Sequence, residues 1–544
     1  MQRAVQRPQR GLRAHGHGGD IDDVRWPLFC TCSWSEKTVA VEVELKLATS
    51  KAGLRKALAL PWLRKMAGDS IKQQHLVSTY FDTRDLALRD RGVSLRIRRI
   101  GGQRLQTIKA SSAVPMARSE WETEVNRDRP ELELISHTDI APIFTGAIAR
   151  RLKPMFETRI ERTAMSLKIG RSDIELALDE GRVAALDNSV DLAEIEIELK
   201  QGEHRDVAVL ARKLAREIPL TFAARAKADW GYAVVEDSVS AATSGGAVTL
   251  APSATTADAF VIIGFHCLRQ VAANELAVRH GDGEGIHRMR VGLRRLRAAL
   301  SLFKDLLYGK ETGGIKSELK WLTAQLGPGR DADVFVSKTA VHYLDRGPNR
   351  SEFEVLAHDL ERARNAGFAK ARAAVESDRY RRLLLDCALW LIDGDWRNDT
   401  DDLRRALRER PARMLAEEEL GRRTRKIVKR ARKLLSLNAM KRHELRIAVK
   451  KLRYGRQFFA SLNTDSGRRK MRRKVDRTLK ALLAALGNLN DIRAHASWAH
   501  DFARANAVSR KAFAAGYLTG REEARASDVL AEAIDAGKRL KALV

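Results

Sequence analysis

Three segments in the first half of the chain alternate apolar and charged residues. Residues 39–47 carry two glutamates and a lysine on one face, residues 94–98 carry two arginines, and residues 193–200 carry three glutamates and a lysine. A period of two residues is typical of β-strands with one apolar and one charged face. Each segment alone would fit a half-buried strand whose charged face meets water. A sheet that curls with these faces inward would instead line a tunnel that holds a cation and a polyanion together.

The rest of residues 37–235 continues as short segments, several of them separated by turn signals such as Gly101-Gly102. Helical patterns occur near residues 54–66 and 205–217. Further strands are expected at residues 76–81, 93–99, 105–109, 120–125, 158–167, 174–178 and 194–199. Their number and spacing favour an antiparallel barrel or sandwich.

The formal net charge of +29 is spread unevenly along the chain. Residues 1–256 carry 39 Lys and Arg against 34 Asp and Glu, whereas residues 257–544 carry 60 against 36. The residues at this boundary are rich in Ser, Thr, Ala and Gly, as flexible linkers are. The first residues lack the apolar segment of a secretory signal. The expected organisation is a disordered tail (1–36), a strand-rich domain (37–235), a linker (236–256) and a helical domain (257–542).

Length and composition exclude several classes of protein. A chain of 544 residues is too long for one core and favours two to four domains. No run of about 18 apolar residues occurs, so no segment is expected to span a membrane. Cys30 and Cys32 are too close for the usual zinc knuckle, and Cys267 and Cys387 lie in apolar helical contexts. We therefore expect neither disulfides nor a cysteine metal site, and a location in the reducing cytoplasm.

Residues 257–540 show helical periodicity and repeat internally. One motif, His287-x-x-Arg290-x-x-x-Arg294-Arg295-Leu296-Arg297, recurs 156 residues later as His443-x-x-Arg446-x-x-x-Lys450-Lys451-Leu452-Arg453. A second motif, Leu326-Gly327 with Asp331, recurs 160 residues later as Leu486-Gly487 with Asp491. Such ordered recurrence indicates two structurally similar halves, about 257–400 and 401–542.

The first motif forms two stripes when it is placed on a helix. An apolar stripe that begins at Met289 is expected to pack inside a helical bundle. A basic stripe begins at His287 and continues through the arginines of the motif. A solvated surface is one interpretation of this stripe, but its duplication favours a binding surface. Residues 422–480 add 23 Lys and Arg against three acids, and a field of that strength indicates an anionic partner.

Several motifs of the first half occur in the order that is found in one known family. They are Glu42-x-Glu44-x-Lys46, Tyr80-Phe81-Asp82-Thr83 followed by residues 92–98, Gln106-Thr107-Ile108-Lys109, Glu120-Trp121-Glu122, residues 194–200, and Lys227 with Gly231-Tyr232. In these residues the chain resembles the CYTH, or triphosphate tunnel metalloenzyme, superfamily. The resemblance implies an eight-stranded antiparallel tunnel that binds a triphosphate with Mg²⁺ or Mn²⁺. The chemistry agrees, because hard divalent cations choose carboxylate oxygens.

The resemblance also assigns roles to the charged residues of the expected tunnel. It makes Glu42, Glu44 and Glu198 the metal ligands, with Glu196 and Asp179 as supporting acids that orient the attacking water. The cations that would face phosphate oxygens are Lys46, Arg96, Arg98, Lys109, Arg159, Arg162 and Lys227. Arg159 and Arg162 differ in strand parity, so both can face inward only across a bulge. Tyr80, Phe81 and Trp121 are expected in the core, and Asp82 is expected to cap a turn.

The helical half resembles the CHAD domain, the conserved-histidine α-helical domain, in its duplicated motif and in Asn274-Glu275 before the first copy. The resemblance covers about residues 257–540 and implies two four-helix bundles with pseudo-twofold symmetry and a basic channel for inorganic polyphosphate. Two histidines without a carboxylate or cysteine at ligand spacing make a poor metal site, so we favour anion binding. The polyphosphate contacts would be His287, Arg290, Arg294, Arg297, His443, Arg446, Lys450 and Arg453.

The sequence thus predicts a metal-dependent enzyme that hydrolyses inorganic triphosphate to diphosphate and phosphate and that also binds polyphosphate. One alternative is a polyphosphate-binding protein without catalytic function. Another is a CYTH enzyme that acts on a nucleotide or on thiamine triphosphate, as an adenylate cyclase or a thiamine triphosphatase. The complete acidic set favours an active metal enzyme. Nucleic acid is the second candidate partner of the basic helices, although no aromatic platform for bases is evident.

Overall fold

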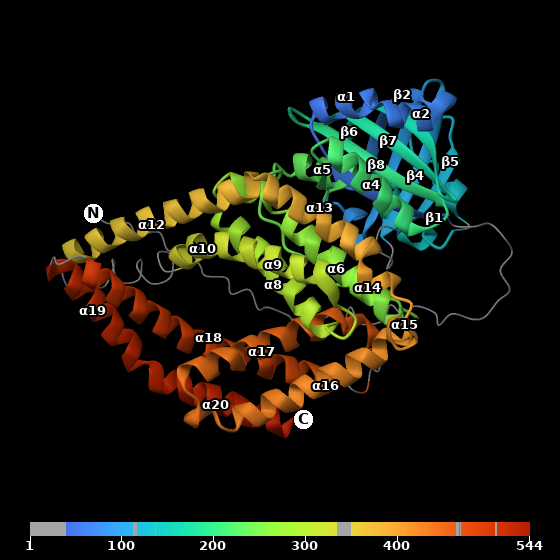
Figure 1. Ribbon diagram of the computed structural model, residues 1–544. Helices are drawn as coiled ribbons and strands as arrows, with labels where there is room; N and C mark the ends of the chain where they lie inside the picture. Colours follow the sequence, from blue (N-terminus) through green and yellow to red (C-terminus); the bar gives the residue numbers. More distant parts are fainter. Residues whose placement is uncertain are drawn as a thin grey trace, which may run out of the picture. The chain divides into compact units, whose positions relative to one another are not determined.

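The computed structural model of the protein describes residues 40–111, 117–136, 138–334, 350–463, 467, 469–505 and 509–544. Within these ranges a strand-rich part is followed by helices (Figure 1). This order confirms the expected fold class, an antiparallel sheet followed by an all-helical region. The expected tail, including Cys30 and Cys32, lies outside the described residues. None of the helices in these ranges combines the length and the apolar character that a membrane crossing requires.

The sheet closes on itself through its first strand. β1 (Ala40–Ala48) pairs antiparallel with β8 (Asn188–Gln201) on one side and with β5 (Ala117–Glu124) on the other. The strand order is β5-β4-β3-β2-β6-β7-β8-β1, and the short β9 (Thr221–Phe222) adds to β1. The remaining strands are β2 (Lys72–Asp82), β3 (Val93–Ile100), β4 (Gln103–Ser111), β6 (Lys153–Ile169) and β7 (Ser172–Ala185). Every strand that the sequence predicts is present, and most are longer than predicted.

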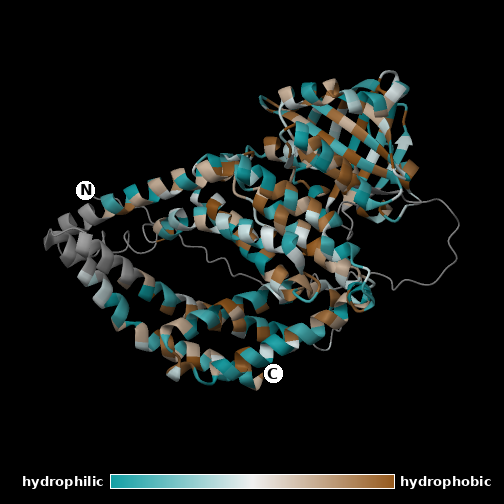
Figure 2. Ribbon diagram, in the orientation of Figure 1, coloured by the Kyte–Doolittle hydropathy of each residue, from teal (hydrophilic) through white to brown (hydrophobic). Residues whose placement is uncertain are grey.

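Along β1 and β8, the closed sheet has an apolar outer face and a charged inner face. Leu45 and Leu47 of β1 and Ile195 and Ile197 of β8 are buried in one apolar cluster, together with side chains of three helices that precede residue 218. These helices are α1 (Lys51–Ala59), α2 (Pro61–Ala67) and α4 (His204–Glu217). Successive strand residues point to opposite faces, so the glutamates and lysines between these apolar residues face the interior of the barrel. The alternation is visible along the strands in Figure 2.

One further helix, α5 (Lys227–Val235), packs against β6, β7 and β8. Its Tyr232 meets the ring of Phe156 edge-on, and Phe156 stacks on Tyr80 with ring centroids 4.5 Å apart. Gly231 leaves room for this contact, because a Cβ atom there would lie 1.9 Å from Cε2 of Phe156. Tyr80 is 3% exposed, as expected of a core residue.

Asp82, at the end of β2, ties the following loop to α5. Its carboxylate is fully buried and accepts hydrogen bonds from the backbone N–H groups of Thr83, Leu88 and Arg89 at 2.6, 2.9 and 3.0 Å. It also accepts a hydrogen bond from the Tyr232 hydroxyl at 3.0 Å. Burial and the Asp82 carboxylate raise the pKa of Tyr232 above its usual value. Asp82 is therefore a turn cap, as its sequence context indicates.

The helical part begins after residue 255. Its helices are α6 (Thr256–Ala272), α7 (Glu275–Arg279), α8 (Gly283–Leu302), α9 (Gly309–Gln325), α10 (Gly327–Val334), α12 (Arg350–Glu376), α13 (Asp378–Asp393), α14 (Asp395–Asn398), α15 (Asp402–Glu409), α16 (Ala412–Ala431), α17 (Ala439–Phe458), α18 (Arg469–Ala505), α19 (Ser509–Ala524) and α20 (Ala526–Ala542). The duplicated basic motif falls on α8 and α17, which are both 20 residues long.

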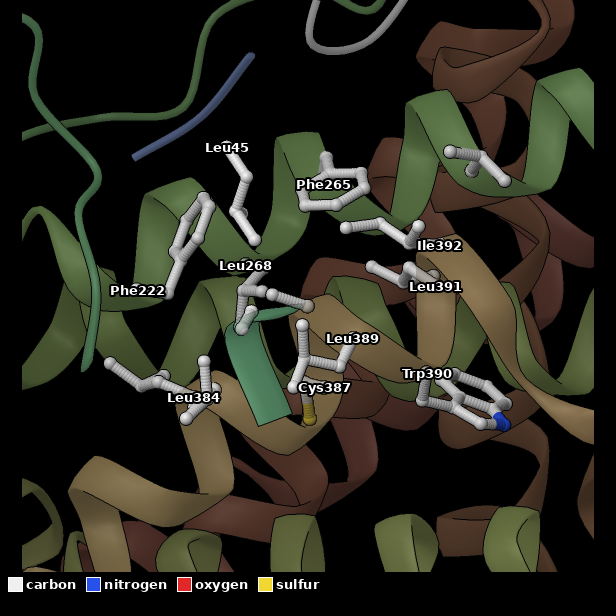
Figure 3. Close-up of a cluster of buried hydrophobic side chains, with 14 of the residues drawn as sticks. Leu45, Phe222, Phe265, Leu268, Leu384, Cys387, Leu389, Trp390, Leu391 and Ile392 are labelled. Carbon is white, nitrogen blue, oxygen red and sulfur yellow. The ribbon is translucent and has the colours of Figure 1, made fainter. Parts of the chain in front are cut away.

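Two apolar cores stabilise these helices. The second half has its own core, which includes Leu445, Leu479 and Leu540. The core of the first half continues into the outer face of the barrel, where Phe222 of β9 meets Phe265 of α6 with ring centroids 5.8 Å apart (Figure 3). The first-half core also contains Cys267 and Cys387, both free and buried, in the apolar helical contexts that the sequence predicts.

The expected linker, 236–256, is attached to the helices at several points. The backbone N–H of Thr243 donates to the Asn274 side chain at 2.8 Å, and the Asn274 amide donates back to the Thr243 carbonyl at 2.9 Å. The backbone N–H of Leu250 donates to the Ser461 hydroxyl at 2.8 Å, and Val248 and Leu250 are buried. These contacts restrain a segment whose composition resembles that of a flexible linker.

We predict that Asp82→Ala destabilises the barrel. The substitution leaves three backbone donors and one hydroxyl buried without an acceptor, which should lower the free energy of unfolding by about 3 kcal/mol or more. Asp90→Ala, in the same loop but with a side chain that is 62% exposed, is the matched control and should have little effect. Urea unfolding of both variants measures the difference, and equal stabilities would contradict the capping role.

Candidate functional site

A network of buried charges occupies the inner face of the barrel beside β1 and β8. Arg162 of β6 donates to both carboxylate oxygens of Asp179, at 2.8 and 2.6 Å, and to Glu196 at 2.5 Å. Lys227 of α5 contacts Asp179 at 2.7 Å and Glu196 at 2.8 Å, and it also contacts Glu194. These five charged residues, from β6, β7, β8 and α5, therefore form one network of contacts.

Lys46 of β1 completes this network by contacting Glu196 and, at 2.6 Å, Glu44. Burial lowers the pKa of Lys46, but Glu196 and Glu44 raise it more, so that it lies above the usual value. Burial raises the pKa of Glu196, but Lys227, Lys46 and Arg162 pull it well below the usual value. The ammonium and guanidinium groups thus keep Glu196 ionised despite its burial.

Three acids of this network, Asp179, Glu194 and Glu196, have carboxylate oxygens within 4.8 Å of one another. Three cations, Lys46, Arg162 and Lys227, contact the same acids, so the three acids are already matched by three cations. A divalent cation placed among the three acids would lie beside these cations. The cluster therefore fits a structural ion network better than a metal site.

Two other carboxylates on the inner face are better placed for a metal. Glu44 and Glu198 are direct cross-strand partners on β1 and β8, with side chains 17% and 19% exposed. Each contacts one lysine of its own strand, Lys46 at 2.6 Å and Lys200 at 2.7 Å. Opposed carboxylates that remain accessible supply the oxygen ligands that a hard divalent cation prefers. Glu42 precedes Glu44 by two residues in β1, and its side chain lies outside the described residues.

A second group of charges lies on the inner face along β3, β4 and β5. Lys109 contacts Glu120 at 2.9 Å, and Arg96 lies 3.9 Å from the same carboxylate and 3.4 Å from the Tyr80 hydroxyl. Burial and the guanidinium groups of Arg96 and Arg162 lower the pKa of Arg98 to about 10. Within the described part of the chain, Nε of Arg98 has no hydrogen-bond partner. Positive charge therefore exceeds negative charge around Arg98.

The structure separates Arg159 from the other predicted cations. Its side chain is 72% exposed and pairs with Glu157 at 2.6 Å on the outer face of β6. Arg162, three residues later, faces inward, and the β6–β7 pairing runs from Glu157 to Ile169 without a bulge between the two arginines. Strand parity therefore places them on opposite faces, so Arg159 is not part of the inner charge network.

Two acids of the inner face were assigned no role from the sequence. Glu194 lies two residues before Glu196 on the same strand, so the alternation of β8 already predicted its inward direction. Glu120 entered the sequence analysis only as part of a motif. Strand pairing places it directly opposite Lys109, and the two side chains form an ion pair. Strand pairing, which the alternation does not specify, was the missing information.

The basic stripes of the two helical repeats meet at one cavity. This cavity, of about 690 Å³, is lined by His287, Arg290 and Arg294 of α8 and by Arg446 and Lys450 of α17. Further lining residues come from α10, α12 and α18, and include Arg330, Asp331, Asn490 and Asp491. Two helices that are far apart in the sequence thus present equivalent residues to the same space.

The cavity concentrates positive charge that is only partly compensated. Burial lowers the pKa of Lys450 to about 8, assisted by Arg446 and Arg294, and burial together with Arg330 lowers the pKa of His287 to about 4. Burial also lowers the pKa of Arg290, and Nη1 of this residue has no hydrogen-bond partner among the described residues. Nε of Arg294 and Nε of Arg446 likewise lack described partners. An anion would supply the acceptors that these donors lack.

The second repeated motif positions the first. Arg290 lies 3.3 Å from Asp331, and Arg446 lies 4.0 Å from Asp491, so the same pair occurs in both repeats. A Cβ atom at Gly327 would lie 3.3 Å from Nη1 of Arg290, and one at Gly487 would lie 3.7 Å from Nε of Arg446, so both glycines lie beside the arginine of their own repeat. The recurrent aspartate therefore contacts one arginine in each repeat.

Three of the predicted polyphosphate contacts do not line this cavity. Arg297 is exposed on α8, and Arg453 is absent from the lining residues. His443 is hydrogen-bonded to Asn490 at 2.6 Å and lines a neighbouring cavity of about 640 Å³. The equivalent histidine, His287, lines the basic cavity itself. Arg330, which the stripe pattern did not include, lines it as well.

Comparison with known proteins identifies two domains. The CYTH domain model matches residues 40–226, and the CHAD domain model matches residues 263–500. An inorganic triphosphatase of Haemophilus influenzae is 29% identical over 200 residues, which cover 36% of this chain and 56% of that protein. The CHAD domain of Ricinus communis matches 55% of this chain and 96% of its own, with 29% identity and a TM-score of 0.47. PptA from Streptomyces chartreusis matches 52% of this chain and 99% of its own, with 18% identity and a TM-score of 0.39.

We predict that Lys227→Ala destabilises the barrel by about 3–5 kcal/mol at pH 7, because it leaves buried carboxylates without one of their cations. With fewer cations nearby, these carboxylates should take up protons more readily. The difference in the free energy of unfolding between the variant and the wild type should therefore become smaller as the pH falls from 7 towards about 4. Lys168→Ala, whose side chain is 87% exposed, is the control and should change little. Thermal unfolding at several pH values measures both effects, and a difference independent of pH would refute the ionic explanation.

Proposed function

Because the chain contains a CYTH domain followed by a CHAD domain, we propose that its barrel hydrolyses inorganic triphosphate to diphosphate and phosphate with Mg²⁺ or Mn²⁺. The observation that carries this proposal is the inner face of the closed barrel, where accessible carboxylates on β1 and β8 share one lumen with guanidinium groups on β3. The relative in Haemophilus influenzae, an inorganic triphosphatase, supports the choice of substrate. We further propose that the basic cavity of the helical part holds polyphosphate.

Glu44 and Glu198, with Glu42, would hold the metal ion. A bound Mg²⁺ or Mn²⁺ would supply charge neutralisation at the phosphate and a water of lowered pKa. Lys46 contacts Glu44 and Glu196 together, so it links the proposed metal ligands to the buried network. The network thereby restrains the position of Glu44.

Arg96, Arg98 and Lys109 would bind the triphosphate oxygens. Arg98 is the strongest candidate, since burial and neighbouring cations lower its pKa and a phosphate anion would reverse that effect. Arg96 and Lys109 already share the Glu120 carboxylate, so Glu120 holds both cations toward the lumen. Charge that develops on the departing diphosphate would then meet fixed cations.

The contacts of Asp179 favour a positioning role over a direct role in water activation. Its side chain is fully buried. Its two oxygens accept hydrogen bonds from Arg162, and one of them also contacts Lys227. Glu196 is 10% exposed and is held by Lys46, Arg162 and Lys227. We therefore assign both acids to the orientation of these cations, and we assign Lys227 and Arg162 to the support of the site.

The cavity of the helical part fits an extended polyanion. Its arginines and lysine come from both repeats, so successive phosphates of one chain could contact α8 and α17 in turn. Donors without described partners on Arg290, Arg294 and Arg446 favour an anion with many equivalent oxygens. No stacked pair of aromatic side chains is found among the described residues that line the cavity, and this favours polyphosphate over single-stranded nucleic acid.

We predict that Glu198→Gln and Glu44→Gln each lower metal-dependent triphosphate hydrolysis by at least about a hundredfold, since each removes a charged ligand. Glu161→Gln is the control, because this acid is 72% exposed on the outer face of β6. Phosphate release from triphosphate, ATP and thiamine triphosphate, with Mg²⁺ and with EDTA, is the measurement. Near-normal activity in either variant would refute the ligand assignment, and faster turnover of ATP or thiamine triphosphate would replace the proposed substrate.

We predict that Arg290→Ala/Arg294→Ala/Arg446→Ala lowers polyphosphate affinity by orders of magnitude, because each charge-assisted contact contributes about 1.5–3 kcal/mol. It should also reduce the slope of log affinity against log salt. Arg288→Ala/Arg297→Ala/Lys441→Ala removes the same charge from the same helices outside the cavity. This control should lower the polyphosphate affinity only slightly, since exposed ion contacts contribute about 0–1 kcal/mol each. An equal loss of polyphosphate affinity in the two triple variants would mean that binding depends on net charge and not on the cavity.

A further inference from the structure

Lys450 differs from the other cations of the basic cavity in chemistry and in its place in the repeat. The residue 156 positions earlier, in the equivalent place on α8, is Arg294, and both side chains line the cavity. An arginine there is permanently charged, whereas a lysine can lose its proton and become a nucleophile. The repeat therefore puts one reactive amine among guanidinium groups.

The surroundings of Lys450 make its deprotonation easier than that of an exposed lysine. Burial disfavours the protonated form of Lys450, and so do Arg446 on its own helix and Arg294 and Arg290 on α8. Asp491 on α18 favours the protonated form. Among the described residues, Nζ of Lys450 has no hydrogen-bond or ion-pair partner. Burial and these guanidinium groups lower its pKa to about 8. The remaining charged groups and the histidine that line the cavity are His287, Arg330 and Asp331.

We propose that Lys450 is an acylation site and that its acyl donor is an acyl phosphate that docks its phosphate group in the basic cavity. The proposal rests on the anion-binding role proposed above. The same guanidinium groups that lower the pKa of the amine would attract an anionic electrophile and hold its phosphate. A neutral acyl donor would gain nothing from them, and this difference makes the proposal testable.

The reaction balances without any further reagent. The lone pair of the neutral Nζ atom attacks the carbonyl carbon of the acyl phosphate and forms the amide bond. The bond between that carbon and the phosphate oxygen breaks, and phosphate departs with the electron pair. One proton of the amine is lost, and the departing phosphate or solvent takes it up. The products are an acylated lysine and inorganic phosphate, which the cavity can also bind.

Acylation would change the proposed function of the cavity. It removes one of the positive charges that face the polyphosphate, and it fills part of the space beside Arg446. We therefore expect weaker polyphosphate binding by the acylated protein. The cavity would respond in this way to the supply of activated acyl groups, and polyphosphate itself would protect Lys450 by occupying the docking site.

The test compares Lys450 with its neighbour Lys451 in the full chain. Burial, Arg423 and Arg297 also lower the pKa of Lys451, but this residue does not line the cavity. Site-specific acetylation rates would be measured by mass spectrometry with acetyl phosphate and, separately, with the neutral donor p-nitrophenyl acetate. The Lys450-to-Lys451 rate ratio should be at least about tenfold larger with acetyl phosphate, at the lower end of the enhancement that a focused field gives. Added triphosphate should abolish this excess.

Two further readouts keep the outcomes distinct. With p-nitrophenyl acetate, the rate at Lys450 should level off above about pH 8, because the neutral amine then predominates. Polyphosphate affinity should fall about tenfold or more after acetylation and in Lys450→Gln. Equal rate ratios with the two donors would overturn the acylation site, even if polyphosphate binds. Failure of the unmodified protein to bind polyphosphate would instead overturn the proposed function of the cavity.

Discussion

The pairing of β1 with both β8 and β5 is the contact on which the barrel and its interior depend. It directs Asp179, Glu194 and Glu196 into a buried space, where desolvation alone would neutralise carboxylates. The compensating cations come from three different elements, β1, β6 and α5, so they meet the acids only when the sheet is closed and α5 is docked. Fold and site are therefore stabilised by the same ion pairs.

The protein holds charge in two contrasting ways. In the network around Glu196, three acids contact three cations. Nearby cations hold the pKa of Glu196 well below its usual value, and nearby acids hold that of Lys227 well above it, whereas burial raises the pKa of Glu194. Around Arg98 and in the basic cavity, cations outnumber acids, and the pKa values of Arg98 and Lys450 fall. A balanced network stabilises the scaffold, whereas an excess of one sign creates a site for a ligand of the other sign.

The internal repeat of the helical part produces one site rather than two. Equivalent arginines of α8 and α17 face the same cavity, and each is oriented by an aspartate of its own repeat. The repeats differ where Arg294 corresponds to Lys450 and Arg330 to Asn490. His287 is therefore influenced by the guanidinium group of Arg330, whereas His443 is hydrogen-bonded to the side-chain amide of Asn490. The two sides of the cavity are thus chemically distinct despite their common origin in the sequence.

The sequence by itself determined the strand alternation, the inward parity of Glu44, Arg98 and Glu196, and the duplicated basic motif, because these follow from periods of 2 and 3.6 residues. Strand parity also predicted that Arg159 and Arg162 point to opposite faces of the sheet unless a bulge lies between them. Only the tertiary structure decided which charges became partners, that Glu120 holds Arg96 and Lys109, and that Arg297 stays outside the cavity. The physical reason is that ion pairing and desolvation depend on distances between elements far apart in the chain, which local periodicity does not specify.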